Sequence, residues 1–285
     1  MVDGRLTPFS LNKASCFGYN WLVGLVLATR HWERNDMQKT ELAQGIIQYT
    51  FDPLPGKHFG NNIYAVVHGN KVLLIDTGYA FQAQQVLEDI RDCGWEIDSV
   101  ILSHFHDDHM QGLRVLPKVP VYGSEHYGVT LELWTDEKDR QYFVPSLLIR
   151  EPYTKDFGQH SVALLPFPGH SMCTILIRIN DTYLHVADEV MFSNDGRPIL
   201  PSADPNQIPR HVESLNRLKA MTSLIFLPAH GPALADRRKM ERDIDNRLCY
   251  FQTILSSGRA LSYEEASKGC DCAYLHSEWH RYVYE

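Results

Sequence analysis

The segment HFHDDH at residues 104–109 constrains this chain more than any other, because three imidazoles and a carboxylate recur there at H-x-H-x-D-H spacing. It directly follows a short apolar run at residues 99–103, which predicts a strand. Residues two apart point the same way in an extended segment, so the first two histidines can face one ion. If the chain then tightens into a turn, the second aspartate and the last histidine reach a neighbouring position. Such ligands suit Zn²⁺, and also Fe or Mn.

Three more residues of ligand type follow other predicted strands. His170 lies in a Pro-Gly-His-Ser stretch, Asp188 follows a strand that ends at Ala187, and His230 lies in a Pro-Ala-His-Gly stretch. Each of them alone is typical of an ordinary turn. In α/β sheets, however, functional residues gather just past the strand ends. Four strand ends that each carry a ligand-type residue therefore predict one shared metal site.

The pattern along the chain predicts an α/β fold. Apolar runs and period-two alternation indicate strands, and apolar residues at helical spacing indicate amphipathic helices. A strand, helix, strand order in under forty residues favours α/β over the other classes. Turns at residues 68–70 and 180–181 predict hairpins. The expected strands are 46–51, 62–67, 71–76, 99–103, 161–165, 174–179, 182–187 and 224–227, and the expected helices are 80–93, 208–222 and 237–255.

We expect one compact domain at residues 45–258, with an N-terminal extension at 1–44 and a C-terminal tail at 259–285 that packs on it. The apolar run at residues 19–29 is shorter than the roughly 20 residues that cross a bilayer, and no small-residue cleavage site follows it. The six scattered cysteines indicate reduced thiols. We therefore expect a cytoplasmic protein without a membrane partner.

The net charge limits the kinds of binding partner that we expect. The 285 residues include 27 Lys and Arg against 35 Asp and Glu, for a net charge of −8. Nucleic acid favours a basic surface, so it is not the expected partner. A small-molecule substrate fits better, and a homodimer remains open.

The ordered set of ligand-type residues resembles the metallo-β-lactamase superfamily. The stretches Leu-Ile-Asp-Thr-Gly at 74–78, Pro-Gly-His at 168–170 and Pro-Ala-His-Gly at 228–231 also match that family's pattern. The resemblance covers roughly residues 45–258 and implies an αββα four-layer sandwich with metals at one edge, between the sheets. It further implies that Asp188 bridges two metals and that Asp76 orients a ligand imidazole by hydrogen bonding. The remaining ligands it implies are His104, His106 and His170 for one metal, and Asp108, His109 and His230 for the other.

The resemblance also implies the chemistry. Two divalent ions, Zn with Fe or Mn as alternatives, would share a hydroxide that attacks the substrate, with Asp108 and Asp188 as the catalytic carboxylates. Histidine at position 106, where redox di-iron members carry Glu, argues against those members. The complete second ligand group argues against mononuclear persulfide-oxidising members. We therefore expect hydrolysis of a small ester, lactone or thioester, as in acyl-homoserine-lactone lactonases and glyoxalase II. The alternatives are a phosphodiesterase of the same superfamily and a non-catalytic metal-containing sensor or interaction protein.

The substrate pocket is harder to assign from the sequence. The interval between His109 and His170 contains a long insert, residues 122–157, which favours a roomy, lactonase-like pocket. Met191 stands where the lactonases place a tyrosine, which argues against a typical lactonase. We assign Phe59 and Met191 to the pocket. Further aromatic residues that could form its walls and suit an acyl chain or an aryl group are His58, Tyr127, Trp134, Tyr142 and Phe143.

A cluster near the C-terminus carries four further residues of ligand type: Cys270, Cys272, His276 and His280. The interval between the cysteine and histidine pairs is much shorter than in zinc fingers. An ordinary tail that packs on the domain, a structural zinc site and a dimer contact all remain open for this cluster.

Overall fold

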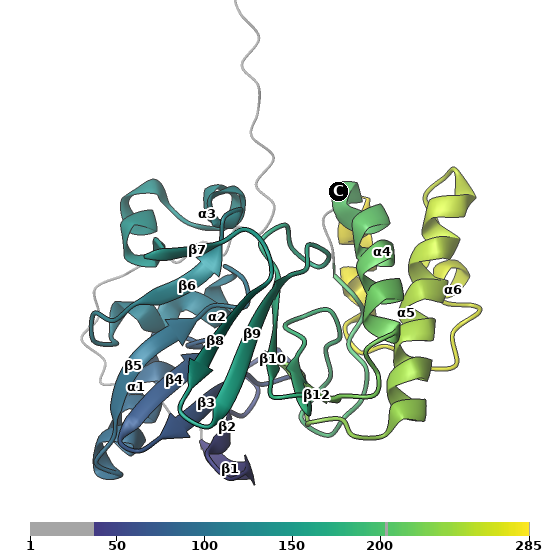
Figure 1. Ribbon diagram of the computed structural model, residues 1–285. Helices are drawn as coiled ribbons and strands as arrows, with labels where there is room; N and C mark the ends of the chain where they lie inside the picture. The colour runs from purple at the N-terminus through teal and green to yellow at the C-terminus, as the bar shows by residue number, and fades with distance from the viewer. Residues whose placement is uncertain (1–36, 203–204, 285) are drawn as a thin grey trace, which may run out of the picture.

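Two β-sheets pack face to face between two layers of helices, as Figure 1 shows for this computed structural model. The structure describes residues 37–202 and 205–284, so the apolar run at 19–29 and most of the expected N-terminal extension lie outside the described residues. One sheet has the strand order β1-β2-β3-β4-β5-β6-β7 and the other β12-β11-β10-β9-β8. The predicted αββα sandwich is confirmed.

The strands are β1 Gln38–Ala43, β2 Ile46–Thr50, β3 Asn62–His68, β4 Lys71–Ile75, β5 Glu96–Ile101, β6 Val121–Ser124, β7 Leu147–Ile149, β8 Tyr153–Phe157, β9 His160–Pro166, β10 Ile175–Ile179, β11 Tyr183–His185 and β12 Ile225–Leu227. The helices are α1 Ala80–Asp92, α2 Asp107–Met110, α3 Tyr127–Trp134, α4 Ile208–Lys219, α5 Arg237–Ser257 and α6 Tyr263–Ala266. Short 3₁₀ turns are η1 Gln111–Arg114, η2 Glu137–Phe143, η3 Pro205–Gln207 and η4 Ser277–Val283.

Strand β3 shows why its sequence forms a central strand. Alternate side chains of a strand point to opposite faces of the sheet. Ile63 and Val67 pack toward the outer helix layer, whereas Tyr64 and Val66 pack between the two sheets. Both faces are buried, so the strand is apolar throughout and its neighbours are fixed in register.

The helices cover the outer faces of the sandwich through the predicted apolar stripes. In α1, Ala83, Val86 and Ile90 are buried against the first sheet. Helices α4 and α5 share a core with the second sheet, to which Leu215 and Phe251 contribute. Figure 1 shows α4 and α5 side by side on the far side of the second sheet. The three predicted long helices are therefore confirmed, with small shifts at their ends.

The structure differs from the sequence-based expectations at two places. Strand β1 pairs antiparallel with β2, so the first sheet begins inside the segment assigned to the extension at 1–44. Residues 38–41 of β1 are all exposed, and such polar edge strands lack the apolar alternation that predicts a strand. The second difference is the insert predicted at 122–157. Its two ends belong to the sheets as β6, β7 and β8, whereas the stretch between β6 and β7 carries α3 and η2.

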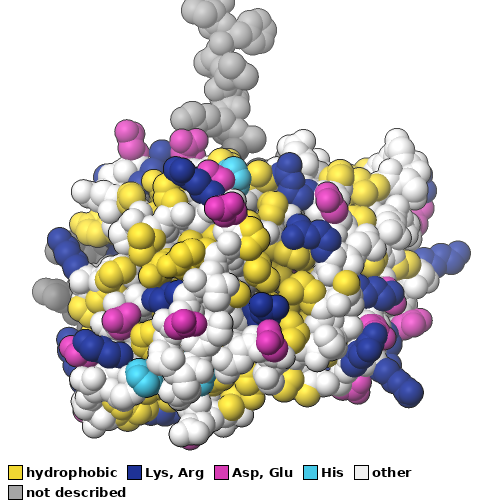
Figure 2. All heavy atoms as spheres, in the orientation of Figure 1, with side chains coloured by type: hydrophobic (Ala, Val, Ile, Leu, Met, Phe, Trp, Pro, Cys, Tyr) yellow, Lys and Arg dark blue, Asp and Glu magenta, His cyan; other side chains and the backbone are white. Residues whose placement is uncertain are grey.

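Two further observations concern the described residues as a whole. None of their helices is long and apolar enough to cross a membrane. Their five cysteines all carry free thiols. Figure 2 shows hydrophobic side chains gathered across the middle of the face on which β7, β8 and β9 lie.

Candidate metal centre

The predicted ligands come from four strand ends that converge at one edge of the sandwich. Residues 104–109 follow β5 in the first sheet, and α2 begins within them at Asp107. In the second sheet, His170 follows β9, Asp188 follows β11 and His230 follows β12. The parallel pairing of β11 with β12 carries Asp188 and His230 out of the same edge.

The first group of ligand atoms contains three imidazole nitrogens. His106 Nδ1 lies 3.0 Å from His104 Nε2 and 3.3 Å from His170 Nε2. Together with Asp188, these residues offer ligand atoms that all lie within 4.8 Å of one another. Three nitrogens that face one point at such spacing can surround a single cation.

The second group combines a carboxylate with two imidazoles. Asp108 Oδ1 lies 3.6 Å from His109 Nε2, and its Oδ2 lies 3.6 Å from His230 Nε2. These three residues also form a set with ligand atoms within 4.8 Å. The structure thus separates the six residues into the same two groups that the family resemblance implies.

Asp188 lies between the two groups. Its Oδ2 is 3.8 Å from His104 Nε2 and 3.5 Å from His109 Nε2, and its Oδ1 is 3.4 Å from His230 Nε2. One carboxylate therefore faces ligands of both groups. This is the geometry that a bridging carboxylate needs.

The hydrogen bonds around the imidazoles fix the tautomers that a metal requires. His109 Nδ1 lies 2.9 Å from Asp76 Oδ2, His170 Nδ1 lies 3.0 Å from the Ser202 carbonyl, and His230 Nδ1 lies 2.9 Å from the Gly60 carbonyl. Carboxylate and carbonyl oxygens accept the Nδ1 protons, which leaves the Nε2 lone pairs pointing into the cluster. His109 Nε2, His230 Nε2 and Asp188 Oδ1 are buried without a hydrogen-bond partner in the described part of the chain. Bound metal ions would satisfy all three atoms, so the donor set fits a metal centre.

The pKa shifts of His104, His106 and Asp188 favour metal binding, whereas at His109 burial lowers the pKa but Asp188 and Asp76 outweigh it and hold that pKa well above its ordinary value. Burial lowers the pKa of His104 well below its ordinary value and lowers that of His106 to about 3, which keeps both imidazoles neutral. Burial acts in the opposite direction on Asp188 by raising its pKa, but the neighbouring His230 and His109 outweigh it and hold that pKa well below its ordinary value. Neutral imidazoles and an ionised carboxylate are the forms that bind a cation.

Asp76 connects the ligand shell to the sheet. Its carboxylate accepts hydrogen bonds of 2.7 Å from both the backbone N–H and the hydroxyl of Ser103, in addition to the contact with His109. Its backbone has φ +59°, a left-handed conformation that aspartate tolerates better than most residues. The side chain therefore orients His109 from a fixed position at the end of β4.

Several residues around the centre were not predicted from the sequence. Ser103, Asn61 and Glu189 hold ligand segments: the Asn61 amide donates to the Asp108 carbonyl at 2.7 Å, and Glu189 accepts from the His170 N–H at 2.8 Å. Burial raises the pKa of Glu189 to about 7. Its position beside Asp188 is the only signal that the sequence offered, because its partners come from distant segments.

The two predicted pocket residues lie beside the second ligand group. The Phe59 ring packs edge-on against His230 with the ring centroids 4.7 Å apart. Met191 and Phe59 are both almost completely buried, and they pack in one small cluster with Ile199. These two side chains therefore pack beneath the loops that carry the ligands, and little of either side chain is exposed to an open pocket.

The C-terminal cluster does not come together as one group. Within the described ranges, His276 lies 2.8 Å from Glu278 Oε1 and 3.1 Å from the His58 N–H, whereas His280 lies between Tyr250 and the Leu261 carbonyl. The Cys270 thiol is directed to the Asn246 carbonyl at 3.4 Å. These contacts match a tail that packs on the domain.

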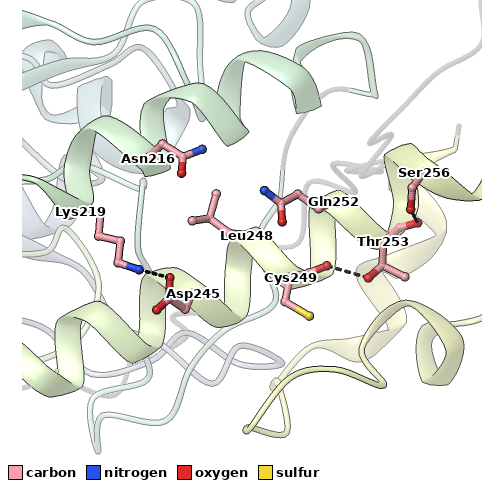
Figure 3. Close-up of a pocket in the computed structure, with 8 residues that line it drawn as sticks. All are labelled: Asn216, Lys219, Asp245, Leu248, Cys249, Gln252, Thr253 and Ser256. Atoms are coloured by element: carbon pink, nitrogen blue, oxygen red, sulfur yellow. Dashed lines mark hydrogen bonds and ion pairs between the residues drawn. The ribbon is translucent and has the colours of Figure 1, made fainter.

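A separate hollow lies between α4 and α5, as Figure 3 shows. It has a volume of about 580 Å³ and contains none of the predicted ligands. Lys219 and Asp245 form an ion pair of 2.6 Å across it. Its position in the outer helix layer separates it from the metal centre.

The comparisons with known proteins agree with this architecture. The family model described as the metallo-beta-lactamase superfamily matches residues 56–230. The matched range covers more than half of the chain and contains all seven predicted ligands. The chain belongs to the metallo-β-lactamase superfamily.

Two curated relatives come from fungi. The lactamase-like protein nscB of Aspergillus fumigatus is 28% identical over 206 residues, which cover 69% of this chain and 56% of that protein. The atrochrysone carboxyl ACP thioesterase of Aspergillus terreus is 24% identical over 216 residues, which cover 74% of this chain and 62% of that protein. The chain thus spans less than two thirds of the length of these relatives.

Two solved structures show the same fold. A metallo-beta-lactamase from Pontibacter korlensis aligns with a TM-score of 0.61 at 16% identity, over 76% of this chain and 99% of that chain. A metallo-beta-lactamase family protein from Thermus thermophilus aligns with a TM-score of 0.59 at 16% identity, over 85% of this chain and 90% of that chain. At these identities the likeness concerns the fold alone.

Proposed function

We propose that this chain is a dinuclear metal-dependent hydrolase that cleaves a small ester, lactone or thioester. The observation that carries the proposal is the position of Asp188 between two groups of ligands, with buried and unpartnered atoms on Asp188, His109 and His230. A relative named as a thioesterase supports the thioester among these substrates. We propose zinc as the native metal, with iron or manganese as alternatives.

We assign the following roles in hydrolysis to the components of the centre. The bound ions would supply activation of a water molecule and polarisation of the scissile carbonyl. Asp188 holds the two ligand groups together. Asp108, with 15% of its side chain exposed against 5% for Asp188, is the carboxylate that we assign to accept a proton at Oδ2. The imidazoles of His104, His109 and His230 are almost completely buried, which excludes water from their side of the centre.

The test combines metal analysis with a substrate panel. Purified full-length protein, loaded with zinc, iron or manganese, should contain about two equivalents of metal per chain. It should hydrolyse members of a panel of aryl esters, lactones and acyl thioesters faster than bis(p-nitrophenyl) phosphate. Absence of bound metal would overturn the proposal, as would faster cleavage of the phosphodiester or no turnover of any compound in the panel.

A further inference from the structure

Helix α3 is fixed beside the metal centre by one of its faces. Thr130 Oγ1 lies 3.1 Å from Ser171 Oγ and 3.0 Å from Cys173 Sγ, in the segment that directly follows His170. One turn earlier, the Tyr127 ring packs against Phe105 with the centroids 5.5 Å apart. These contacts tie α3 to the segments that carry the first ligand group.

Trp134 continues this face of α3 toward the centre. It lies four residues after Thr130, and residues at that spacing share one face of a helix. Its ring centroid is 5.2 Å from that of His106 at an interplanar angle of 66°. At the same time 40% of the residue is exposed. The indole therefore contacts a ligand imidazole on one side and solvent on the other.

Two aliphatic residues of the same helix are also exposed, on the flank next to the face that carries Thr130 and Trp134. Val129 and Leu133 are spaced by one turn on α3, and 49% and 69% of these residues are exposed. A single exposed apolar residue, such as Leu255 on α5 with 46% exposed, is common and carries no meaning. Three exposed apolar residues on one short helix beside a cluster of polar ligands are uncommon, and such surfaces mark contact with an apolar ligand.

Among the described residues, the other side of the centre offers no comparable surface. Phe59 contacts His230, but only 3% of it is exposed, and the tail residues His276 and Trp279 cover it. In the part of the chain that the structure describes, an apolar substituent on the substrate therefore finds exposed apolar side chains on the His106 side and not on the His230 side.

We propose that α3 binds the apolar acyl group of the substrate through Trp134, Leu133 and Val129. The substrate class of the site is then esters and thioesters of medium-chain or aromatic acyl groups, with Trp134 as the specificity-determining residue. This inference rests on the proposed function. The planar indole beside His106 holds the acyl group next to the scissile carbonyl, and the aliphatic side chains extend its contact along the helix.

The test is the dependence of hydrolysis on the acyl group. N-acetylcysteamine thioesters of acetate, butanoate, octanoate and benzoate serve as probes with zinc-loaded, full-length protein. We expect kcat/KM for octanoyl and benzoyl thioesters to exceed that for the acetyl thioester. Trp134→Ala should lower the ratio of kcat/KM for the octanoyl thioester to that for the acetyl thioester about tenfold, as expected for the loss of apolar contact in a specificity pocket. Trp134→Phe should retain most of the ratio.

A matched pair of variants controls for general effects on the surface. Leu133→Asp should lower the octanoyl-to-acetyl ratio, whereas Leu255→Asp makes the same change on α5 and should leave it unchanged. If Trp134→Ala fails to fold or loses its metal, the comparison of Trp134→Phe and Leu133→Asp with the wild type decides. Two results would overturn this inference alone. One is turnover with equal kcat/KM for the octanoyl and acetyl thioesters, and the other is an octanoyl-to-acetyl ratio that Leu133→Asp and the Trp134 variants leave unchanged. No turnover of any thioester probe would also overturn this inference, whereas the proposed function would be overturned only if the panel of aryl esters and lactones were not hydrolysed either.

Discussion

Asp188 links the two ligand groups because its oxygens face imidazoles that belong to different groups. His230, by contrast, lies near Asp108 and Asp188, at 3.6 and 3.4 Å, and near the His109 ring, so it faces only the second group and Asp188. The removal of one or the other side chain should therefore have different consequences for metal binding. This difference gives a test of the dinuclear arrangement at the scale of single residues.

We expect Asp188→Ala to lose both metal ions and His230→Ala to lose one. Turnover should fall at least about 100-fold in both variants, since changes in residues that merely support metal ligands already cost 10–100-fold. Metal content by mass spectrometry and steady-state kinetics measure the two effects. Asp181→Asn is the control, because that carboxylate is 92% exposed and should be neutral in both assays. Equal metal loss from both variants would contradict the assignment of Asp188 as the bridge.

Glu189 predicts a pH dependence of stability in the metal-free protein. Burial raises its pKa from about 4.5 in the unfolded chain to about 7 in the folded chain, so the folded state binds more protons between these values. The contribution of Glu189 to the free energy of unfolding should therefore be greatest below pH 4.5. It should fall by up to about 3 kcal/mol as the pH rises to 7.

Glu189→Gln removes the ionisation and keeps the size of the side chain. We expect its unfolding free energy, measured by urea titration after chelation of metal, to vary less between pH 5 and 7 than that of the wild type. Other groups titrate in this range in both proteins, so the difference between the two curves isolates Glu189. Parallel curves would show that Glu189 stays ionised in the folded protein.

The residues that the structure brings together at the candidate metal centre could be chosen from the sequence, but most of the residues that support them could not. The ligands carry their signal locally, in the spacing of residues 104–109 and in turns after strands. Glu189 has the Ser214 hydroxyl and the His170 N–H as partners, and Gly60 supplies its carbonyl to His230 from 170 positions away. Such pairs depend on the packing of distant segments, and no local spacing in the sequence records them.

At the scale of elements, the C-terminal tail braces the loop between β2 and β3. His276 Nε2 accepts the His58 N–H at 3.1 Å, and the His276 ring stacks on Trp279 with the centroids 4.2 Å apart. Phe59 packs between this pair and His230. The tail thus supports the second ligand group through the Phe59 ring, which contacts both the tail and His230.

His276→Ala should destabilise the protein by about 2–3 kcal/mol, because it removes a buried hydrogen bond and leaves alanine at φ +60°. His276→Asn should cost less, since asparagine tolerates the left-handed conformation and offers an acceptor. Urea unfolding measures both free energies. The control is His126→Ala, whose side chain is 50% exposed and whose loss should cost less than about 0.5 kcal/mol. Equal costs for His276→Ala and His126→Ala would rule out the brace.

Strand prediction succeeded for β3 and β4 and failed for β1 and β7 for one physical reason. Strands β3 and β4 are buried on both faces, so their apolar runs are long enough to recognise. Strands β1 and β7 lie at the ends of the seven-stranded sheet, where one side lacks a neighbour and the side chains are exposed. Their backbone hydrogen bonds, not their side-chain pattern, place them in the sheet.

At the scale of the whole molecule, the metal centre joins the two halves of the sandwich. Residues 104–109 come from the first sheet, whereas His170, Asp188 and His230 come from the second. Each ligand group contains residues of both sheets. A bound ion in either group would therefore connect the two sheets at this edge. Without the ion, nothing would hold the imidazoles of one sheet next to the carboxylates and imidazoles of the other.

Removal of metal should consequently loosen the sandwich at this edge without unfolding it, because the core between the sheets does not include the ligands. Ligand binding at about 1,000 times its dissociation constant stabilises a protein by roughly 4 kcal/mol. For a chain of this size we expect chelation to lower the melting temperature by about 10 °C. Hydrogen exchange should increase at residues 104–110, 168–174, 186–192 and 228–232, and should stay unchanged in α1 and β3. Re-addition of zinc should restore both measurements, whereas an unchanged melting temperature after verified metal loss would show that the centre does not connect the sheets.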